Sequence, residues 1–452
     1  MANVQLILIH ITILTLISKV ECLTMKMIPI DSPHLKILPE NFNVQERHQY
    51  LINVSLSRAN KFQLAPESFR VTIHGLDSSY YVTSLNIGEG QGALSTYLLL
   101  DTGSEQTWVQ CEGCNPCFQL NGKTFAYKKS PNFAKMSLTD ELCFPRSSYS
   151  GSCRFEATYR RSKAIGFLGR DTFFFKNSHT GEMEGYRGLA FGCALNNEGF
   201  SFGRNTGPQN VIAGIHGLAP GRRSFINQLD NQIKGRFSYC LPSWNEESPR
   251  TTTMFFGDDA QIRGDGTRQV QVISMQVKKR YHLNLNGISV DGNRLPIDPS
   301  IFNYDPVTFT KGFFIDSGAP YTTLPKIAHD LVVDAISKYF FKKYKWRSIF
   351  PPPTGSFQLC YKSYPRDERD FPSVVLHFAR PQGSGEVDMV LGKDNMFKKT
   401  DRGVGFCMMV LPNNNEHANS LFGAFQQTNF NILFDISNGL LYFVPERCYE
   451  VQ

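Results

Sequence analysis

Short runs of β-forming residues, separated by glycine-containing turns, recur along the chain from residue 80 onward. Tyr80–Ile87 alternates between apolar and polar positions, and after a turn at residues 88–92 a second run covers Ser95–Leu100. Alternation with a period of two is typical of a strand with one buried face. The pattern predicts a mainly β protein with closed or packed sheets. Further runs of this kind are Asp171–Phe175, Gly188–Gly192, Thr252–Phe256, Phe313–Ile315, Ser373–Phe378 and Leu440–Val444.

One segment has the apolar spacing of a helix. Pro325–Tyr344 carries apolar residues three and four positions apart, which would form one buried face of a helix. Lys342, Lys343 and Lys345 lie at its C-terminal end, where positive charge is favourable beside the helix dipole. We interpret this basic cluster as a solvated helix end.

The two halves of the chain contain similar segments. Leu98–Ser104 reads Leu-Leu-Leu-Asp-Thr-Gly-Ser, and Phe313–Ala319 reads Phe-Phe-Ile-Asp-Ser-Gly-Ala. Downstream of each lies a glycine-containing apolar segment, at Ala213–Leu218 and at Asn419–Ala424. This internal similarity predicts two lobes of similar build that face each other.

The N-terminal region differs from the rest of the chain. Residues 1–22 contain an apolar run, Val4–Ile17, which predicts a signal peptide; an N-terminal membrane anchor is the alternative. Residues 23–76 are polar and proline-containing and are interpreted as a prosegment, with a plain extension as the alternative. Asn53 begins an Asn-Val-Ser glycosylation sequon. The two lobes would then cover residues 77–241 and 242–452.

Composition narrows the class of protein. With 41% hydrophobic and 19% charged residues in 452, the chain is neither disordered nor a coiled coil. Its net charge of +7 is spread without a Lys/Arg block, so no nucleic-acid partner is expected. Removal of Cys22 with the signal peptide leaves ten of the 11 cysteines, which fits five disulfides in an oxidising compartment. We therefore expect an extracellular (apoplastic) protein, or alternatively a vacuolar one, with no membrane attachment in its mature form.

The repeated Asp-(Thr/Ser)-Gly triplet has a chemical rationale. A buried strand would hold each carboxylate, and the glycine would let the backbone turn and approach closely. Two such carboxyls facing each other cannot both ionise, so the pair holds one proton. One member can then act as base on a water while the other donates to a carbonyl. Asp101 and Asp316 are the candidate catalytic residues.

The segments Asp101–Cys111 and Ile315–Gly318 resemble the two active-site motifs of pepsin-like aspartic proteases. The cysteine spacing Cys111, Cys114, Cys117 is similar to that of the nepenthesin-type branch of plants. The resemblance covers nearly the whole chain and implies two orthogonally packed β lobes, a central cleft and a β-hairpin flap. It implies an aspartic endopeptidase made as a zymogen, acting as a monomer on peptides or proteins, without a cofactor or metal.

The same resemblance implies roles for individual residues. Asp101 and Asp316 match the catalytic pair, and Thr102 and Ser317 match the hydroxyls that brace the two loops. Tyr159 matches the flap tyrosine and Trp108 its indole partner. The disulfides implied by the family are Cys111–Cys114, Cys117–Cys193, Cys143–Cys153, Cys240–Cys448 and Cys360–Cys407. An iron–sulfur site at the first three cysteines is the alternative, but no fourth Cys-Pro follows them.

Three positions depart from the family pattern. The flap reads Tyr159-Arg-Arg-Ser-Lys163, without the usual glycines and with three cations. Ala319 replaces a hydroxyl residue after the second triplet, and Glu105 stands where Asp or Ser is commoner. The altered flap keeps a second hypothesis open: a catalytically weak pepsin-fold binding protein, such as an inhibitor of secreted glycoside hydrolases. A lectin-like or storage β protein is a third.

Overall fold

The computed structural model describes residues 23–29, 80–159, 162–177, 182–200, 202, 207–243, 251–262, 269–350, 352, 357–381, 383, 385–399, 405–415 and 418–448. For residues 23–29 it describes the backbone alone. The expected signal peptide, the sequon at Asn53, most of the expected prosegment, and Arg160 and Arg161 of the flap lie outside the described residues.

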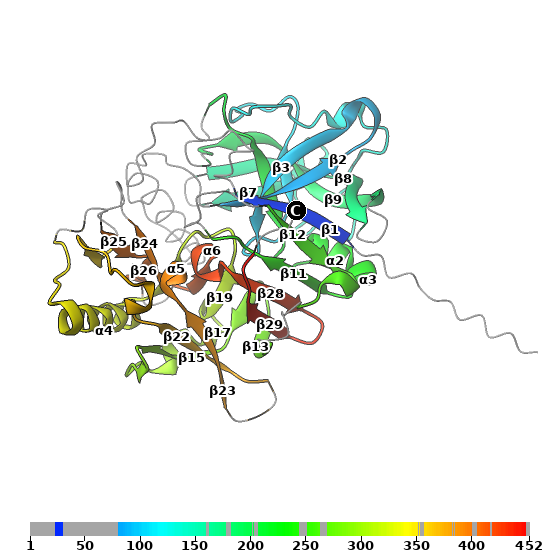
Figure 1. The fold of residues 1–452 in the computed structure, drawn as a ribbon. Helices are drawn as coiled ribbons and strands as arrows, with labels where there is room; N and C mark the ends of the chain where they lie inside the picture. Colours follow the sequence, from blue (N-terminus) through cyan, green and yellow to red (C-terminus); the bar gives the residue numbers. More distant parts are fainter. Residues whose placement is uncertain are drawn as a thin grey trace, which may run out of the picture.

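The described chain is mainly β and forms two bodies, which Figure 1 shows above and below the strands at its centre. All eight runs predicted as strands lie in strands, and the predicted helix is α4 (Lys326–Tyr344), so the predicted fold class is confirmed. The strands of the first half are β1 (Leu23–Pro29), β2 (Tyr81–Ile87), β3 (Leu94–Asp101), β4 (Trp108–Gln110), β5 (Ala134–Lys135), β6 (Ser148–Tyr149), β7 (Ser152–Tyr159), β8 (Ser162–Asn177), β9 (Met183–Glu198), β10 (Ile212–Gly217) and β11 (Arg236–Cys240).

The second half is built from shorter strands, with most of the helical residues. Its strands are β12 (Thr252–Phe256), β13 (Gln271–Val277), β14 (Tyr281–Leu283), β15 (Leu285–Val290), β16 (Asn293–Arg294), β17 (Tyr304–Asp305), β18 (Thr310–Lys311), β19 (Phe313–Asp316), β20 (Thr322–Pro325), β21 (Cys360–Tyr361), β22 (Val374–Ala379), β23 (Glu386–Leu391), β24 (Phe397–Lys399), β25 (Phe406–Met408), β26 (Val410–Asn413), β27 (Ser420–Gly423), β28 (Phe430–Asp435) and β29 (Leu440–Pro445). The short helices α5 (Lys393–Met396) and α6 (Ala424–Gln427) also lie in the second half, whereas α2 (Phe225–Gln228) and α3 (Asp230–Ile233) lie in the first.

The two halves repeat one arrangement of parallel strands. In the first half β3 lies parallel to β10, with Asp101 opposite Gly217. In the second half β19 lies parallel to β27, with Asp316 opposite Gly423. Each aspartate thus ends a strand whose neighbour brings a glycine to the same level. The similarity of the two sequence segments therefore reflects a similarity of structure.

One continuous series of strand pairs links the two lobes. The series runs β2–β1–β12–β11–β28–β29–β13, all antiparallel, so strands from both ends of the chain meet in one sheet. Figure 1 shows β1 in dark blue beside β12 at the centre of the molecule. Leu23–Pro29 falls within the expected prosegment, so release of residues 23–76 would remove a strand from between β2 and β12.

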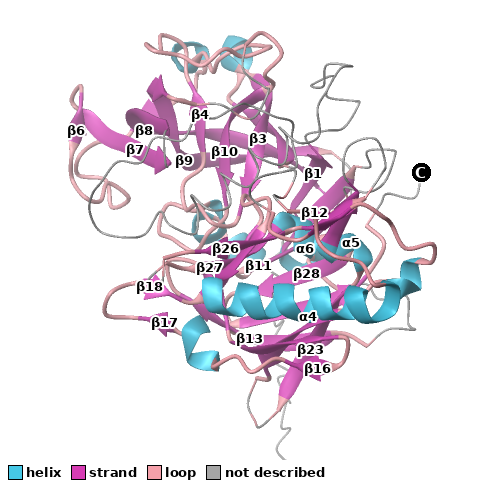
Figure 2. Ribbon diagram, turned by 90° about the vertical axis from the view of Figure 1, so that its left-hand side faces the viewer, coloured by secondary structure: helices cyan, strands magenta, loops and turns pink. Residues whose placement is uncertain are grey.

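The helix α4 lies along the outside of the second lobe (Figure 2). Its buried residues are Ala328, His329, Val332, Ile336 and Phe340, which recur at helical spacing and pack it onto the sheet beneath. Within the described part of the chain, no helix combines the length and the apolar character needed to cross a bilayer.

Five disulfides are present, and two of them differ from the pairs that the family resemblance implied. Cys143–Cys153, Cys240–Cys448 and Cys360–Cys407 are as expected. Cys111 instead pairs with Cys193, and Cys114 with Cys117. The reason is strand register: β4 lies parallel to β9 with Val109 opposite Cys193, and Cys111 follows directly after β4, so its Cα lies 5.5 Å from that of Cys193.

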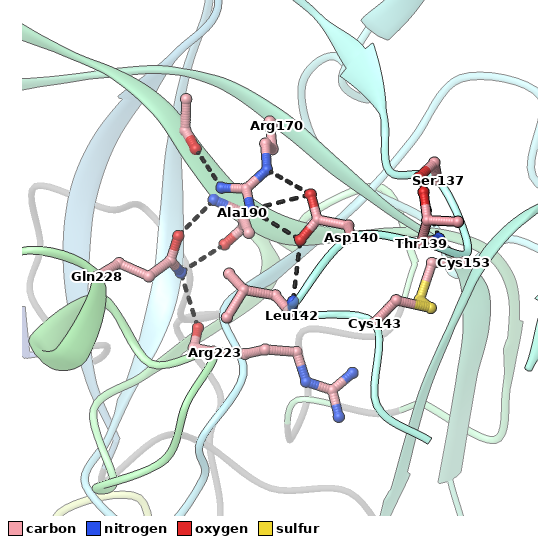
Figure 3. Close-up of polar contacts among 11 residues, drawn as sticks. Ser137, Thr139, Asp140, Leu142, Cys143, Cys153, Arg170, Ala190, Arg223 and Gln228 are labelled. Carbon is pink, nitrogen blue, oxygen red and sulfur yellow. Dashed lines mark hydrogen bonds and ion pairs between the residues drawn. A yellow bond between two sulfur atoms is a disulfide. The ribbon is translucent and has the colours of Figure 1, made fainter. Parts of the chain in front are cut away.

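A polar network attaches the loop that carries Cys143 to the long β8–β9 hairpin (Figure 3). Asp140 accepts hydrogen bonds from the Arg170 guanidinium at 3.0–3.2 Å and from the Leu142 backbone N–H at 2.9 Å. Burial opposes ionisation of Asp140, but these hydrogen bonds lower its pKa overall. Gln228 of α2 bonds the backbone of Ala190 in β9 at 2.6 and 3.0 Å. The loop and α2 are thus fixed to the same hairpin.

Three histidines are buried in the core. His216 lies in β10, fully buried, with its Nδ1 3.1 Å from the Thr83 hydroxyl. Its Nε2 has no hydrogen-bond partner among the described residues. Burial lowers the pKa of His216 to about 3, that of His282 to about 3 and that of His329 to about 4. These rings stay neutral in the folded chain and would take up protons on unfolding below pH ~6.5.

We predict that His216 makes the fold less stable in acid. A depressed histidine pKa means that the unfolded state binds more protons, so stability is complete above pH ~6.5 and falls as the pH falls toward 3. At pH 4.5 the loss of unfolding free energy that is due to His216 is about 2–3 kcal/mol. Replacement by Leu or by Gln should shrink the loss of unfolding free energy between pH 7.5 and pH 4.5 by that amount.

The measurement is denaturant unfolding at both pH values. The Gln variant keeps a polar side chain without the titration, so it separates the proton effect from the change in packing. An unchanged pH dependence in both variants would show that His216 does not titrate on unfolding.

Candidate active site

Asp101 and Asp316 lie at the ends of β3 and β19, and their side chains are 0% and 1% exposed. The backbone N–H of Gly103 donates to Asp101 Oδ1 at 2.9 Å. The N–H groups of Gly318 and Ala319 donate to Asp316 Oδ1 at 2.9 and 3.1 Å. Each loop therefore turns back on its own carboxylate and fixes the orientation of the group.

Thr102 and Ser317 join the two loops by reciprocal hydrogen bonds. The N–H of Thr102 donates to Ser317 Oγ at 3.1 Å, and the N–H of Ser317 donates to Thr102 Oγ1 at 2.9 Å. Each hydroxyl in turn donates to a carbonyl of the opposite strand, at 3.3 Å to Ile315 and to Leu100. All four partners are buried. This is the bracing geometry that the sequence predicted for these two residues.

The loop of the first aspartate directly contacts the carboxyl of the second. A Cβ atom added to Gly103 would lie 2.5 Å from Asp316 Oδ2, closer than any real contact of that kind. Only glycine therefore leaves room for Asp316 at this position. The structure thus brings the carboxyls of Asp101 and Asp316 to a single seam between the lobes.

The positions that follow the two triplets differ in whether their side chain can donate a hydrogen bond. The Ser104 hydroxyl donates to Asp101 Oδ2 at 2.5 Å. The corresponding position after the second triplet is Ala319, which is fully buried against Phe314 and Leu421 and has no hydroxyl. The first aspartate thus receives a side-chain donor for which the second has no equivalent at the same position.

Tyr159 and Trp108 are also brought together. The indole Nε1–H of Trp108 donates to the Tyr159 hydroxyl at 2.9 Å, from β4 to the end of β7. Phe200 packs against both rings, at 5.0 Å from Trp108 and 5.7 Å from Tyr159. Lys163 of the flap pairs with Glu156 at 2.8 Å, so this cation is neutralised within the hairpin rather than directed to a substrate.

Sequence reasoning missed a buried tyrosine behind the aspartates. Tyr239 of β11 is fully buried and donates from its hydroxyl to Gln427 Oε1 at 2.7 Å. Burial first, and then the negative charge of Asp316, raise the pKa of Tyr239 well above its usual value, while a hydrogen bond with Thr102 opposes the shift. A neutral phenol is thereby held next to the dyad loops. No pattern in the sequence around residue 239 indicated this position.

Glu105, a departure to which the sequence assigned no role, has one in the structure. Its Oε1 accepts the backbone N–H of Arg223 at 3.0 Å, and its side chain packs directly over Gly221. Arg223 is largely buried, which lowers its pKa, whereas the charge of Glu105 raises it. Glu105 therefore ties the first aspartate loop to the segment that follows β10.

A second cluster of reactive residue types lies elsewhere, on β15, β22 and β23. Ser289 Oγ lies 2.6 Å from His377 Nε2, and His377 Nδ1 lies 2.7 Å from Asp388 Oδ1. The Ser289 side chain is buried and its partners are on neighbouring strands of one sheet. We interpret this series of hydrogen bonds as a polar link between strands rather than as a nucleophilic site. No group of three or more His, Cys, Asp or Glu side chains within the described ranges is arranged to hold a metal ion.

Comparison with known proteins places this geometry in a family. Residues 81–258 match the family described as xylanase inhibitor N-terminal, and residues 280–445 match xylanase inhibitor C-terminal. Aspartic proteinase nepenthesin-1 of Nepenthes gracilis is 28% identical over 400 residues, 87% of this chain and 83% of the relative. Aspartyl protease AED1 of Arabidopsis thaliana is 30% identical over 377 residues, 82% of this chain and 73% of the relative.

Solved structures show the same fold at lower identity. The crystal structure of edgp has a TM-score of 0.63 and 17% identity, covering 82% of this chain and 93% of its own. Basic 7S globulin from soybean has a TM-score of 0.63 and 16% identity, covering 95% of this chain and 99% of its own. With both halves matched and a 30% identical aspartyl protease aligned along most of its length, the chain belongs to the plant aspartic protease family with the pepsin fold.

Proposed function

We propose that this protein is an aspartic endopeptidase that uses a water molecule activated between Asp101 and Asp316. The observation that carries the proposal is the interlock of the two catalytic loops. Thr102 and Ser317 exchange hydrogen bonds at 2.9–3.1 Å, while Gly103 leaves space for the Asp316 carboxyl. Such preorganisation favours a reaction that needs both carboxyls at once.

The chemistry follows from one proton shared by two carboxyls. The ionised member accepts a proton from the water, which attacks the carbonyl carbon of the peptide bond. The protonated member donates to the carbonyl oxygen, so a tetrahedral diol forms without a covalent link to the enzyme. Collapse of this intermediate returns the protons to the dyad and to the leaving amine. The Trp108–Tyr159 pair would hold the flap over an extended peptide.

We further propose that the protein is secreted and made as a zymogen. The apolar run Val4–Ile17 and the five disulfides support passage through an oxidising compartment. Strand β1 lies in the segment expected to be released, paired with β2 and β12. Activation that removes it would need another segment, or solvent, to satisfy the exposed strand edges.

One prediction of this proposal concerns the dyad. Replacement of Asp101 or of Asp316 by Asn should reduce peptide hydrolysis by roughly 10³-fold or more, and the double variant should lose little beyond either single one. The measurement is cleavage of denatured protein at pH 3–6, together with N-terminal analysis of the purified full chain after acid incubation. Retention of more than about a tenth of the activity in either single variant would contradict the assignment.

A second prediction uses the difference between the positions that follow the two triplets. A hydroxyl that donates to a carboxylate stabilises its charged form and lowers the apparent pKa of the pair, and such a bond is worth about 1.5–3 kcal/mol, or one to two pH units. Ser104→Ala should therefore move the activity optimum to higher pH, by up to about one unit. Ala319→Ser should move it to lower pH, since serine adds one donor in a buried position.

The exchange variant Ser104→Ala with Ala319→Ser supplies the control. It keeps one hydroxyl donor in total, so its optimum should lie between those of the two single variants. Full pH–kcat/KM profiles measure the shift, and unfolding curves check that each variant is folded. Shifts in the same direction for both single variants would contradict the proposed hydrogen-bond control.

A binding function is the second candidate, favoured by the family descriptions and by the flap. Both halves match families described for xylanase inhibitors, and Tyr159 is followed by Arg-Arg-Ser instead of glycines. If the protein acts in this way, purified full chain should inhibit a secreted xylanase or related glycoside hydrolase, and Asp101→Asn should inhibit equally well. Proteolysis without inhibition would exclude this function for the enzymes tested, and inhibition without proteolysis would favour it.

A further inference from the structure

A groove of about 440 Å³ lies at the C-terminal end of α4, on the second lobe. It is lined by Ser337, Lys338, Phe341, Trp346, Arg347, Ser348 and Tyr361, and we call it the basic aromatic groove. None of these residues belongs to the dyad loops or the flap. The groove therefore requires an explanation separate from peptide hydrolysis.

Stacked aromatic rings give the groove a rigid wall. Trp346 stacks on Tyr344 at 4.4 Å between centroids and on Phe340 at 6.0 Å, with interplanar angles of 19° and 18°. Phe340 is fully buried, so this stack is anchored in the core of the lobe. Tyr361 forms part of the floor, 1% exposed. An occupant would meet ring faces that are already held in place, which lowers the entropy cost of binding.

A large apolar side chain remains exposed in the groove. Phe341, one of the lining residues, is 47% exposed. A solvated helix end, the interpretation that the lysines alone suggested, does not account for an aromatic ring left in water. Exposed apolar surface rimmed by polar groups is typical of a binding site.

Carboxylates match only some of the positive charges near the groove. Lys343 pairs with Asp370 at 2.7 Å and Lys338 with Asp334 at 2.6 Å. Lys342, Lys345 and Arg347 are exposed, and the described residues offer no ion-pair partner to any of them. Lys345 and Arg347 instead lie 5.5 and 6.0 Å from the centroid of the Phe341 ring. Two cations thus lie over one exposed aromatic ring.

We propose that the basic aromatic groove binds an acidic polysaccharide, a chain of pyranose rings that each carry a carboxylate. The apolar faces of the rings would pack on Phe341 and Trp346, as extended carbohydrate does on amphipathic aromatic side chains. The carboxylates would pair with Lys345 and Arg347, the second of which can bind one in bidentate fashion. The hydroxyls of Ser337 and Ser348 would hydrogen-bond the sugar hydroxyls. The groove combines the three kinds of contact that such a chain requires.

A single open site with exposed charges binds its ligand weakly, and its affinity depends on the salt concentration. Screening shortens the reach of these cations to about 8–10 Å at ordinary ionic strength. Attachment to a polymer with many binding positions would raise the apparent affinity by multivalency. The site would then hold the protein on an acidic polysaccharide matrix, and the dyad, which shares no residue with the groove, would remain free to act.

The test uses polygalacturonate as the probe and the purified full chain. Affinity electrophoresis should show retardation in gels that contain polygalacturonate and none in gels that contain neutral dextran. Trp346 is one of only three tryptophans in the chain, so binding at the groove should change the intrinsic tryptophan fluorescence measurably. The apparent affinity should fall about tenfold between 50 and 200 mM salt, as expected when a few ion pairs are screened.

Two sets of variants separate charge from ring contact. Lys345→Ala with Arg347→Ala should weaken binding at least about tenfold, and Phe341→Ala should weaken it with every charge retained. The matched control is Lys128→Ala with Lys129→Ala, which removes two exposed cations from the first lobe and should leave binding unchanged. All of these positions lie away from the dyad, so hydrolysis of a peptide substrate should be unaffected in each.

Several outcomes would overturn the proposal. One such outcome is a control double variant that loses as much affinity as the groove variant, because equal losses would mean diffuse attraction to a basic protein. Equal retardation by poly-glutamate would show that the groove recognises negative charge or an acidic peptide rather than sugar rings. Binding to anionic lipid vesicles without binding to polygalacturonate would assign the surface to a membrane. A failure of peptide hydrolysis would leave this proposal unaffected, since the binding assay needs no catalysis.

Discussion

The reciprocal hydrogen bonds between Thr102 and Ser317 are the constraint on which the rest of the site depends. Each hydroxyl accepts an N–H from the opposite loop and donates to a carbonyl of the opposite strand. Because Thr102, Ser317 and the residues whose carbonyls accept from them are all buried, loss of one hydrogen-bond partner would leave an unsatisfied donor or acceptor at the centre of the molecule. The lobes therefore cannot separate at this point without a large cost, and the two carboxyls stay aligned.

The architecture repeats this logic at a larger scale. Residues from both ends of the chain meet in the sheet that contains β1, β12, β11 and β28, and Cys240–Cys448 closes the same region covalently. Tyr239 projects from β11 to Gln427 behind the dyad loops. Local hydrogen bonds set the distance between the carboxyls, and the shared sheet keeps the two lobes from changing that distance.

The sequence predicted the repeated elements well and the irregular contacts poorly. The strands and α4 follow from short-range patterns, whereas the contact of Thr102 with Ser317 was implied by the family resemblance. The partners of Cys111 and Cys193 depend on the parallel register of β4 with β9, which no local pattern records. The roles of Tyr239 and Glu105 likewise arise from long-range packing. The basic cluster after α4 showed its charges in the sequence, whereas the groove needs Tyr361 from a distant segment.

Acid chemistry and acid stability make opposite demands on this chain. The dyad requires one retained proton, which favours low pH. The buried rings of His216, His282 and His329 keep the native state from taking up protons that the unfolded chain binds below pH ~6.5, so stability falls as the pH falls. The absent hydroxyl at Ala319 reduces this conflict, because one donor fewer lets the dyad keep its proton to higher pH. If the protein is the proposed endopeptidase, the substitution that departs from the family pattern would shift catalysis toward the mildly acidic range in which the fold retains most of its stability.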